Sequence, residues 1–431
     1  MKRKTQRFIE AQSGQRKSLI ERIDLKHVII AAAVLVVAVI LGSLYIWYVR
    51  TYGGARKISV YNETRADYEW RKIASDEGIT CDYLLSRTNN LMIDGGEEGT
   101  MIPSWLMIEG RLVTEPQEES GIYDLSDQAL LLKIYVRKAD RKEAKKLKKR
   151  VMSEIDIASQ SLDDRMMWLE AFVEYYSVYG TTSDLHKIED MTEELFDEEG
   201  MLRPVTLTYA EYHQNAIGLS EEEYTDPTLD TRPGLADESY ADIEGVELSA
   251  IRLRLIKTLE DNDFLPEGSF ERNLAIVKGG VVSDSIPLFS YAYTIAGDGS
   301  VSYIHSYRHA AAISVSESVT VMRNLAEVGE LPGQAFSWLK STFMNEGVIR
   351  EDYYISTGKT EGAESVDSYL DIMSIAIESG DRDLYGSACA REGARVATYS
   401  GSPALSMIFR TSGDRYVFYA SENLGMILAL T

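Results

Sequence analysis

The sequence predicts a mainly α-helical protein, an (α/α)6 toroid of paired helices preceded by one N-terminal transmembrane helix. Three features indicate this. An uncharged apolar run lies near the start of the 431 residues, helical runs separated by short polar turns occupy most of the remainder, and no long series of strand-like segments appears. Helical runs that are apolar on all sides alternate with runs that have one polar face, which is typical of an inner ring of helices enclosed by an outer ring.

The apolar run from Val28 to Val49 predicts a membrane-spanning helix. It contains no charged residue, and at about 1.5 Å per residue it spans roughly 33 Å, enough to cross a bilayer core. The 27 residues before it carry eight Lys or Arg against three Asp or Glu, a bias that holds a flank in the cytoplasm. We therefore expect a single-pass cell-membrane protein with a cytoplasmic N-terminus and an extracytoplasmic C-terminal domain. A cleaved signal peptide is the alternative.

Four parts follow from this interpretation. The last part is large enough for one large domain or two ordinary ones. In chain order the parts are a basic cytoplasmic tail at 1–27, the transmembrane helix at 28–49, a juxtamembrane linker at 50–65 and the extracytoplasmic toroid domain at 66–431.

Paired helices recur along the large domain. The run 125–136 is apolar nearly all round, and a basic amphipathic run, 143–154, follows it after a short turn. The same order repeats at 163–180 and 184–196, where Asp184 is placed to start the second helix. Because we find no fixed period or repeated consensus, a toroid is favoured over a helical solenoid.

Composition excludes several classes of function. The formal net charge of -23 would repel phosphate backbones, so nucleic acid is not an expected partner. The five His and two Cys form no HExxH motif and no Cys/His cluster, so neither a metal nor another cofactor is expected. Cys81 and Cys389 are equally compatible with one disulfide and with two buried thiols.

Acidic residues begin the predicted inner helices. Glycosidic bond cleavage needs one protonated carboxyl beside the leaving oxygen and one ionised carboxylate opposite. Asp127 begins the run 125–136, and Asp163 and Asp164 begin the next inner helix. A structural role as helix caps or first-turn acids is equally open for all three.

In the order of these segments the chain resembles the family-8 glycoside hydrolases. The segment EGRLVT, Glu109 to Thr114, precedes LSDQALLL, and the resemblance places Asp127 at the family's general acid and Asp164, in LDDRMMW, at a sugar-binding Asp. The segment SYADIEGVELSAIRL retains Ser239 and Tyr240 of a family-like S-Y-x-x-P motif but lacks its proline. The resemblance implies a six-hairpin toroid, an inverting mechanism and a β-1,4-glucan-like substrate.

The sequence departs from the family at the catalytic base. The family places an Asp three residues before an Arg, whereas in ESVTVMR the residue three before Arg323 is Thr320. A threonine cannot act as that base, so either another acid takes the role or hydrolysis has been lost. Candidate bases are Glu317, Asp284 and Asp242, and candidate substrate-binding residues are Asp163, Asp164, Tyr240 and Arg323.

Three functions remain open. The first is a membrane-tethered glycoside hydrolase that acts on an exopolysaccharide or cell-wall glycan with Asp127 as the acid. The second is a catalytically inactive glycan-binding or scaffold subunit of a polysaccharide synthesis or export complex, with those proteins as partners. The third is a helical sensor or adhesion domain, which no motif in the sequence supports. A facing carboxylate near Asp127 would favour the first over the second.

Overall fold

The computed structural model describes residues 25–61, 64–93, 101–109, 123–210, 240–305, 312–354, 357–402, 404–412 and 415–431. The segment Gly110–Thr114 of the family-like opening motif, and Ser239, lie outside these ranges. The chain divides into two compact units: residues up to Arg56 together with Gly180–His186, and Lys57–Tyr179 together with Lys187–Thr431.

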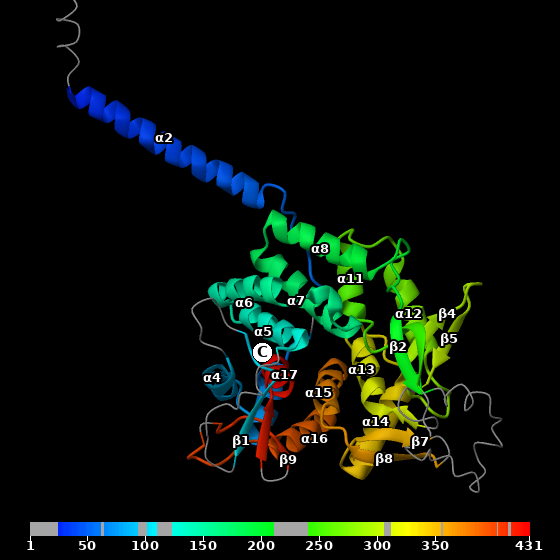
Figure 1. Cartoon of the computed structure of the whole chain (residues 1–431). Coiled ribbons are helices and arrows are strands. Elements are labelled where there is room, and N and C mark those ends of the chain that lie inside the picture. The colour runs from blue at the N-terminus through cyan, green and yellow to red at the C-terminus, as the bar shows by residue number, and fades with distance from the viewer. Residues whose placement is uncertain are drawn as a thin grey trace, which may run out of the picture. The chain divides into compact units, whose positions relative to one another are not determined.

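The first unit is built around helix α2 (Leu25–Tyr52), drawn in blue in Figure 1. Its apolar side chains are exposed, Leu35 to 67% and Val34 to 64%. Beyond the helix, the Gly54 N–H donates to the Thr182 hydroxyl (3.3 Å), which donates to the Thr51 carbonyl (3.2 Å).

The predicted membrane anchor at 28–49 is contradicted. A span must combine sufficient length with sustained apolar character, and within the described ranges no helix meets both requirements. The predicted single-pass topology, with a cytoplasmic N-terminus and an extracytoplasmic C-terminal domain, depended on this anchor and is contradicted with it.

The second unit contains the inner helices. Contacts connect α11 to α13, α13 to α15, α15 to α17, α17 to α5 and α5 to α7, and ion pairs connect α7 to α11 (Figure 1). These helices are α5 (Leu125–Arg137), α7 (Leu162–Tyr179), α11 (Leu253–Asp261), α13 (Val315–Ala326), α15 (Ser368–Ser379) and α17 (Ala420–Ala429).

Other helices pack outside this ring. α6 packs on α5, α12 on α11, α14 on α13, α16 on α15, α4 on α17, and α3 on α16. Their bounds are α3 (Tyr68–Asp76), α4 (Cys81–Met92), α6 (Arg141–Glu154), α12 (Ser269–Gly279), α14 (Gly333–Glu346) and α16 (Arg382–Gly393); α8 (Thr182–Leu195) begins in the first unit and ends in the second.

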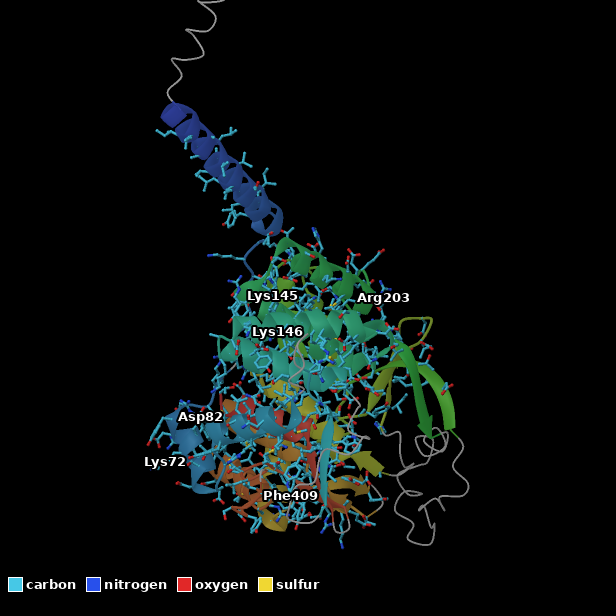
Figure 2. The ribbon with its side chains drawn as sticks, turned by 60° about the vertical axis from the view of Figure 1, so that its left-hand side comes forward. Lys72, Asp82, Lys145, Lys146, Arg203 and Phe409 are labelled. Carbon is cyan, nitrogen blue, oxygen red and sulfur yellow. The ribbon has the colours of Figure 1, made fainter. Side chains whose placement is uncertain are left out.

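Burial distinguishes the two kinds of helix as the sequence predicts. In α5, nine side chains of thirteen residues are buried, on all sides of the helix. In α6 only Ala144, Leu147 and Val151 are buried, at the spacing of one helical face, whereas Lys145 and Lys146 lie on its polar side (Figure 2). The prediction of a mainly helical fold with inner and outer helices is confirmed.

In the described part of the chain, three small antiparallel sheets join the helices, which the sequence did not predict. Their strand orders are β1-β10-β9, β2-β3-β4-β5 and β6-β7-β8. The strands are β1 (Trp105–Glu109), β2 (Val205–Ala210), β3 (Tyr240–Glu247), β4 (Ala292–Ile295), β5 (Val301–Ile304), β6 (Ala312–Ser314), β7 (Arg350–Tyr354), β8 (Lys359–Glu364), β9 (Arg410–Ser412) and β10 (Arg415–Tyr419).

Strands precede the N-termini of four inner helices. β3 precedes α11, β6 precedes α13, β8 precedes α15 and β10 precedes α17. An outer helix follows most inner helices and returns the chain, so successive inner helices run in the same direction. Their N-termini therefore share one edge of the ring, which we call the N-terminal edge.

Candidate active site

Asp127 lies in the first turn of α5, at the N-terminal edge. The neighbouring Gln128 fixes the chain before β1, because its side-chain amide accepts from the Ile102 N–H (3.0 Å) and donates to the Ile102 carbonyl (2.7 Å). These two hydrogen bonds place Ser104 beside the helix. The Ser104 hydroxyl accepts a hydrogen bond from the Asp124 N–H (3.0 Å) and forms another with the Asp127 carboxyl.

The Asp127 carboxyl has the properties of a proton donor. Its side chain is only 3% exposed, and Oδ1 has no hydrogen-bond partner among the described residues. Burial raises the pKa of Asp127 to about 7; the Ser104 hydrogen bond opposes this rise, and the charges of Asp124 and Asp164 add to it. An acid of this kind holds its proton to near neutral pH.

Asp163 and Asp164 begin α7 at the same edge. The Ser161 hydroxyl donates to the Asp164 carboxylate (2.6 Å) and accepts from the Asp164 N–H (3.1 Å), which caps the helix. Asp163 instead accepts from the Arg252 guanidinium (2.9 Å). Asp164 is thus a first-turn acid of a helix that Ser161 caps, which is one of the structural roles that the sequence left open, while Asp163 forms an ion pair.

A further carboxylate that the sequence analysis missed lies at the end of β3. Glu247 accepts a hydrogen bond from the Tyr291 hydroxyl (2.5 Å). Burial raises its pKa, the Tyr291 hydrogen bond opposes the rise, and the charges of Asp163 and Asp164 add to it. Asp127 and Asp164 lie in the first turns of α5 and α7, which pack together, and Glu247 precedes α11 at the same edge of the ring. We call these acidic residues of the N-terminal edge the carboxylate cluster.

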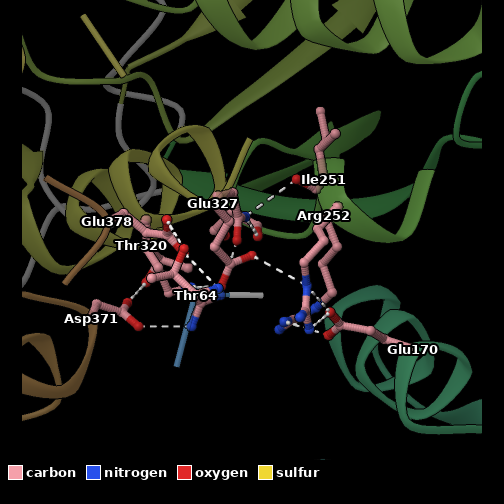
Figure 3. Close-up of polar contacts among 12 residues, drawn as sticks. Thr64, Glu170, Ile251, Arg252, Thr320, Glu327, Asp371 and Glu378 are labelled. Carbon is pink, nitrogen blue, oxygen red and sulfur yellow. Dashed lines mark hydrogen bonds and ion pairs between the residues drawn. The ribbon is translucent and has the colours of Figure 1, made fainter. Parts of the chain in front are cut away.

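A network of buried ion pairs lies along the inner helices (Figure 3). Glu170 of α7 pairs with Lys133 of α5 (2.9 Å) and with Arg254 of α11 (2.5 Å). Burial alone would raise the pKa of Glu170, but Lys133, Arg254 and Arg252 hold it well below its usual range. Arg252 pairs with Asp163 at the edge and with Glu170 (3.6 Å) deeper in the ring, so the network reaches the carboxylate cluster.

Thr320 and Arg323 of α13 both bind Asp371 of α15. The Thr320 hydroxyl donates to Asp371 Oδ2 (2.7 Å) and Arg323 donates to Oδ1 (2.7 Å) (Figure 3). Arg323 and Asp371 line a cavity of about 250 Å³ together with Lys133, Glu170, Glu327 and other side chains of the network. The position that lacks the family's Asp is therefore occupied by a hydroxyl that binds a carboxylate from the next inner helix.

The sequence-predicted bases occupy three different places. Glu317 lies in the first turn of α13, at the N-terminal edge, where the Ser314 hydroxyl caps its N–H (3.4 Å). Asp242 is exposed within β3, and Asp284 is exposed in the loop after α12. Tyr240 begins β3. Of the three acids, Glu317 alone begins an inner helix.

Sequence signals for the missed residues were weak. Glu247 stands in a Gly-containing strand, without the helix-start pattern that singled out Asp127 and Asp163. Tyr291 lies 44 positions away, and only the β3-β4 pairing brings the two segments together. Pairing between distant segments is not a property of local sequence.

The sequence also made predictions about metals and cysteines, and the structure places one tryptophan in the core. Cys81 and Cys389 are free thiols, so the disulfide interpretation is wrong. In the part of the chain that the structure describes, no group of His, Cys, Asp and Glu side chains is arranged to hold a metal ion. Trp168 is fully buried and stacks on Phe172 with ring centroids 6.2 Å apart, which is a core role.

Comparisons with known proteins give a fold but not a family. No protein-family model and no curated protein sequence matches the chain. Among solved structures, a novel α-amylase from Clostridium perfringens matches with a TM-score of 0.58 and 14% identity, over 83% of this chain and 97% of that one. A β-1,3-1,4-glucanase from Paenibacillus sp. X4 matches with a TM-score of 0.50 and 9% identity, over 87% and 95%.

A GH8 endo-β-1,4-glucanase from an Achatina fulica gut metagenomic library matches with a TM-score of 0.46 and 10% identity, over 81% of this chain and 96% of that one. At such identities the likeness concerns fold alone. The helical ring of this chain therefore has the six-hairpin toroid architecture found among glycosidases.

Proposed function

We propose that this chain is a glycoside hydrolase, that residues 66–431 form its toroid domain, and that Asp127 is the proton donor. The observation that carries the proposal is the buried Asp127 carboxyl, with one oxygen unpartnered among the described residues and a pKa of about 7. A protonated carboxyl at the edge of a glycosidase-like toroid is what the leaving oxygen of a glycoside requires.

The proposed substrate is an uncharged polysaccharide of the β-glucan class. The net charge of -23 disfavours polyanionic chains. The Paenibacillus protein is named as a β-1,3-1,4-glucanase and the Clostridium protein as an α-amylase, so β-glucan and starch are the first two substrates to compare.

The residues around Asp127 have narrower proposed roles. Asp163 and Asp164 are proposed to contact sugar hydroxyls, as is Tyr240. Arg323 is held by Asp371, which favours a supporting role in the ring. Of the bases considered from the sequence, Glu317 is better supported than Asp242 or Asp284, because it begins an inner helix at the edge that carries Asp127.

A second function, glycan binding without hydrolysis, is favoured by one observation. Thr320 replaces the Asp of the family-like motif, and its hydroxyl is committed to Asp371. A protein of this kind would bind a polysaccharide and release no new reducing ends.

The experiment is a reducing-end assay of the purified chain with β-1,3-1,4-glucan and with starch, comparing the wild type, Asp127→Asn and Asp124→Asn. We expect Asp127→Asn to lose roughly 10²–10⁴-fold in rate, the usual contribution of general acid catalysis. Asp124→Asn should retain hydrolysis, because Asp124 is exposed and its side chain caps nothing. Wild-type binding without release of reducing ends would establish the second function instead.

A further inference from the structure

Glu247 combines an anchored oxygen with a free one. The Tyr291 hydroxyl fixes Oε1 at 2.5 Å. In the ranges that the structure describes, no hydrogen bond or ion pair reaches Oε2, and the side chain is partly buried at the end of β3. A carboxylate held at one oxygen and open at the other can orient a water molecule and take its proton.

The neighbouring carboxylates already accept hydrogen bonds from other side chains. Asp163 is bound by Arg252, and Asp164 accepts from the Ser161 hydroxyl that caps its helix. Glu247 has no cationic partner among the described residues, and a neutral phenol holds it. It is therefore the acid of the cluster best placed to accept and release a proton.

Asp127 supplies an independent sign that the cluster faces a ligand. Its carboxyl is more than nine-tenths buried, and Oδ1 lacks a partner among the described residues. A buried oxygen in this state is disfavoured unless another molecule completes its hydrogen bonds. Asp127 begins α5, which packs on α7, and Asp163 in the first turn of α7 pairs with Arg252, just after Glu247 and at the start of α11. The two acids therefore lie at the same edge of the ring.

We propose that Glu247 is the catalytic base of the reaction in which Asp127 is the acid, and that Tyr291 is the positioning residue that holds it. The proposal rests on the glycoside hydrolase function proposed above. Glu247 would supply the base that Thr320 cannot. Glu247 lies at the end of a strand rather than in an inner helix.

The proposed step balances without a further reactant. A water molecule gives a proton to Glu247 as its oxygen bonds to the anomeric carbon. The glycosidic C–O bond breaks, its electron pair passes to the leaving oxygen, and that oxygen takes the proton of Asp127. Glu247 ends protonated and Asp127 ionised, and exchange with solvent restores both groups.

The pH dependence of hydrolysis separates this role from a structural one. Glu247 must be ionised to act, so activity is lost as pH falls through its pKa. Burial has the largest effect and raises the pKa of Glu247; the Tyr291 hydroxyl lowers it, and the charges of Asp163 and Asp164 raise it further. Removal of the hydroxyl in Tyr291→Phe should raise the pKa of Glu247 and move the acidic limb to higher pH.

The test measures hydrolysis against pH for the wild type, Glu247→Gln, Tyr291→Phe and Glu317→Gln, with thermal unfolding to verify that each variant folds. We expect Glu247→Gln to lose roughly 10²–10⁴-fold in kcat with KM little changed. Tyr291→Phe should lower kcat by less than Glu247→Gln does, because the carboxylate remains but is no longer held, and its acidic limb should shift upward by a measurable fraction of a pH unit.

Four outcomes would overturn the proposal. Glu247→Gln with wild-type kcat, or an acidic limb unmoved in Tyr291→Phe, removes Glu247 from the base role. Loss of activity in Glu317→Gln but not in Glu247→Gln assigns the base to α13, while the proposed function stands. A wild-type protein that hydrolyses neither glucan refutes the proposed function itself, and the role of Glu247 fails with it.

Discussion

At the scale of single residues, Asp127 is destabilising because its burial opposes its ionisation. Its pKa in the folded protein is about 7, against an ordinary value of 3.8. The folded state therefore binds more protons than the unfolded state between these pH values, and stability is lost as pH rises from about 4 to about 7. The difference corresponds to at most about 4 kcal/mol.

We therefore expect Asp127→Asn to be more stable than the wild type at pH 8, by about 1–4 kcal/mol in the free energy of unfolding. The advantage should shrink toward pH 4, where the wild-type carboxyl is neutral in the folded state and only about half ionised in the unfolded state. Urea unfolding at pH 8 and pH 4.5 measures both values. An equal difference at the two pH values would show that Asp127 is ionised in the folded protein.

Whether the sequence identifies a site residue depends on whether the pattern that marks it lies in the neighbouring residues. Asp127 and Asp163 were identified because each follows a polar turn and begins an apolar helical run. Asp371 was not identified from the sequence, because its partner Thr320 lies 51 positions away on another inner helix. Glu247 depends likewise on Tyr291, so local sequence predicted the edge that carries the site but not the partners that complete it.

At the scale of elements, the contact between α7 and α11 depends on charge. Arg254 is 4% exposed and pairs with Glu170 (2.5 Å) and Glu174 (3.2 Å). Lys133 also reaches both acids. Such a network resists removal of one member, because the remaining buried charges lose their compensation.

Arg254→Met should therefore lower the free energy of unfolding by about 3–5 kcal/mol, because it leaves two buried carboxylates with too few cationic partners. Arg165→Met is the control: its partner Glu194 is 52% exposed, so its loss should amount to less than about 1 kcal/mol. Urea unfolding of both variants measures the contrast. Equal effects would mean that the buried network adds nothing beyond a surface ion pair.

Elements also mark the limits of the sequence prediction. Alternating burial in α5 and α6 followed from hydrophobic periodicity, which is a local property. The sheets were missed because their strands are short, β6 having three residues and β4 four, and are stabilised by pairing with distant segments. The anchor prediction, which rested on the length and apolar character of the run 28–49 and on the basic segment before it, was wrong, because no helix in the described part of the chain is long and apolar enough to span a membrane.

At the scale of the whole molecule, the chain before α3 connects the C-terminal ends of two inner helices. The Ser59 N–H donates to Asn262 Oδ1 (2.9 Å), and Asn262 Nδ2 donates to the Ser59 carbonyl (2.8 Å), at the end of α11. The Thr64 hydroxyl donates to Glu378 (2.7 Å), near the end of α15. This connection lies at the ends of the inner helices opposite to those that carry Asp127.

Asn262→Ala removes both hydrogen bonds to Ser59 and a third, from Nδ2 to the Thr258 carbonyl (2.7 Å). At about 1 kcal/mol for each bond, we expect a loss of about 1–3 kcal/mol in unfolding free energy and faster amide exchange around residues 58–61. Hydrolysis should be unchanged, because the altered contacts lie away from the N-terminal edge. Asn345→Ala, at an exposed position of α14, is the matched control and should change stability by less than about 0.5 kcal/mol. If Asn262→Ala instead reduced kcat without faster exchange, the two ends of the inner ring would be coupled, and the separation between the structural end and the catalytic edge would be wrong.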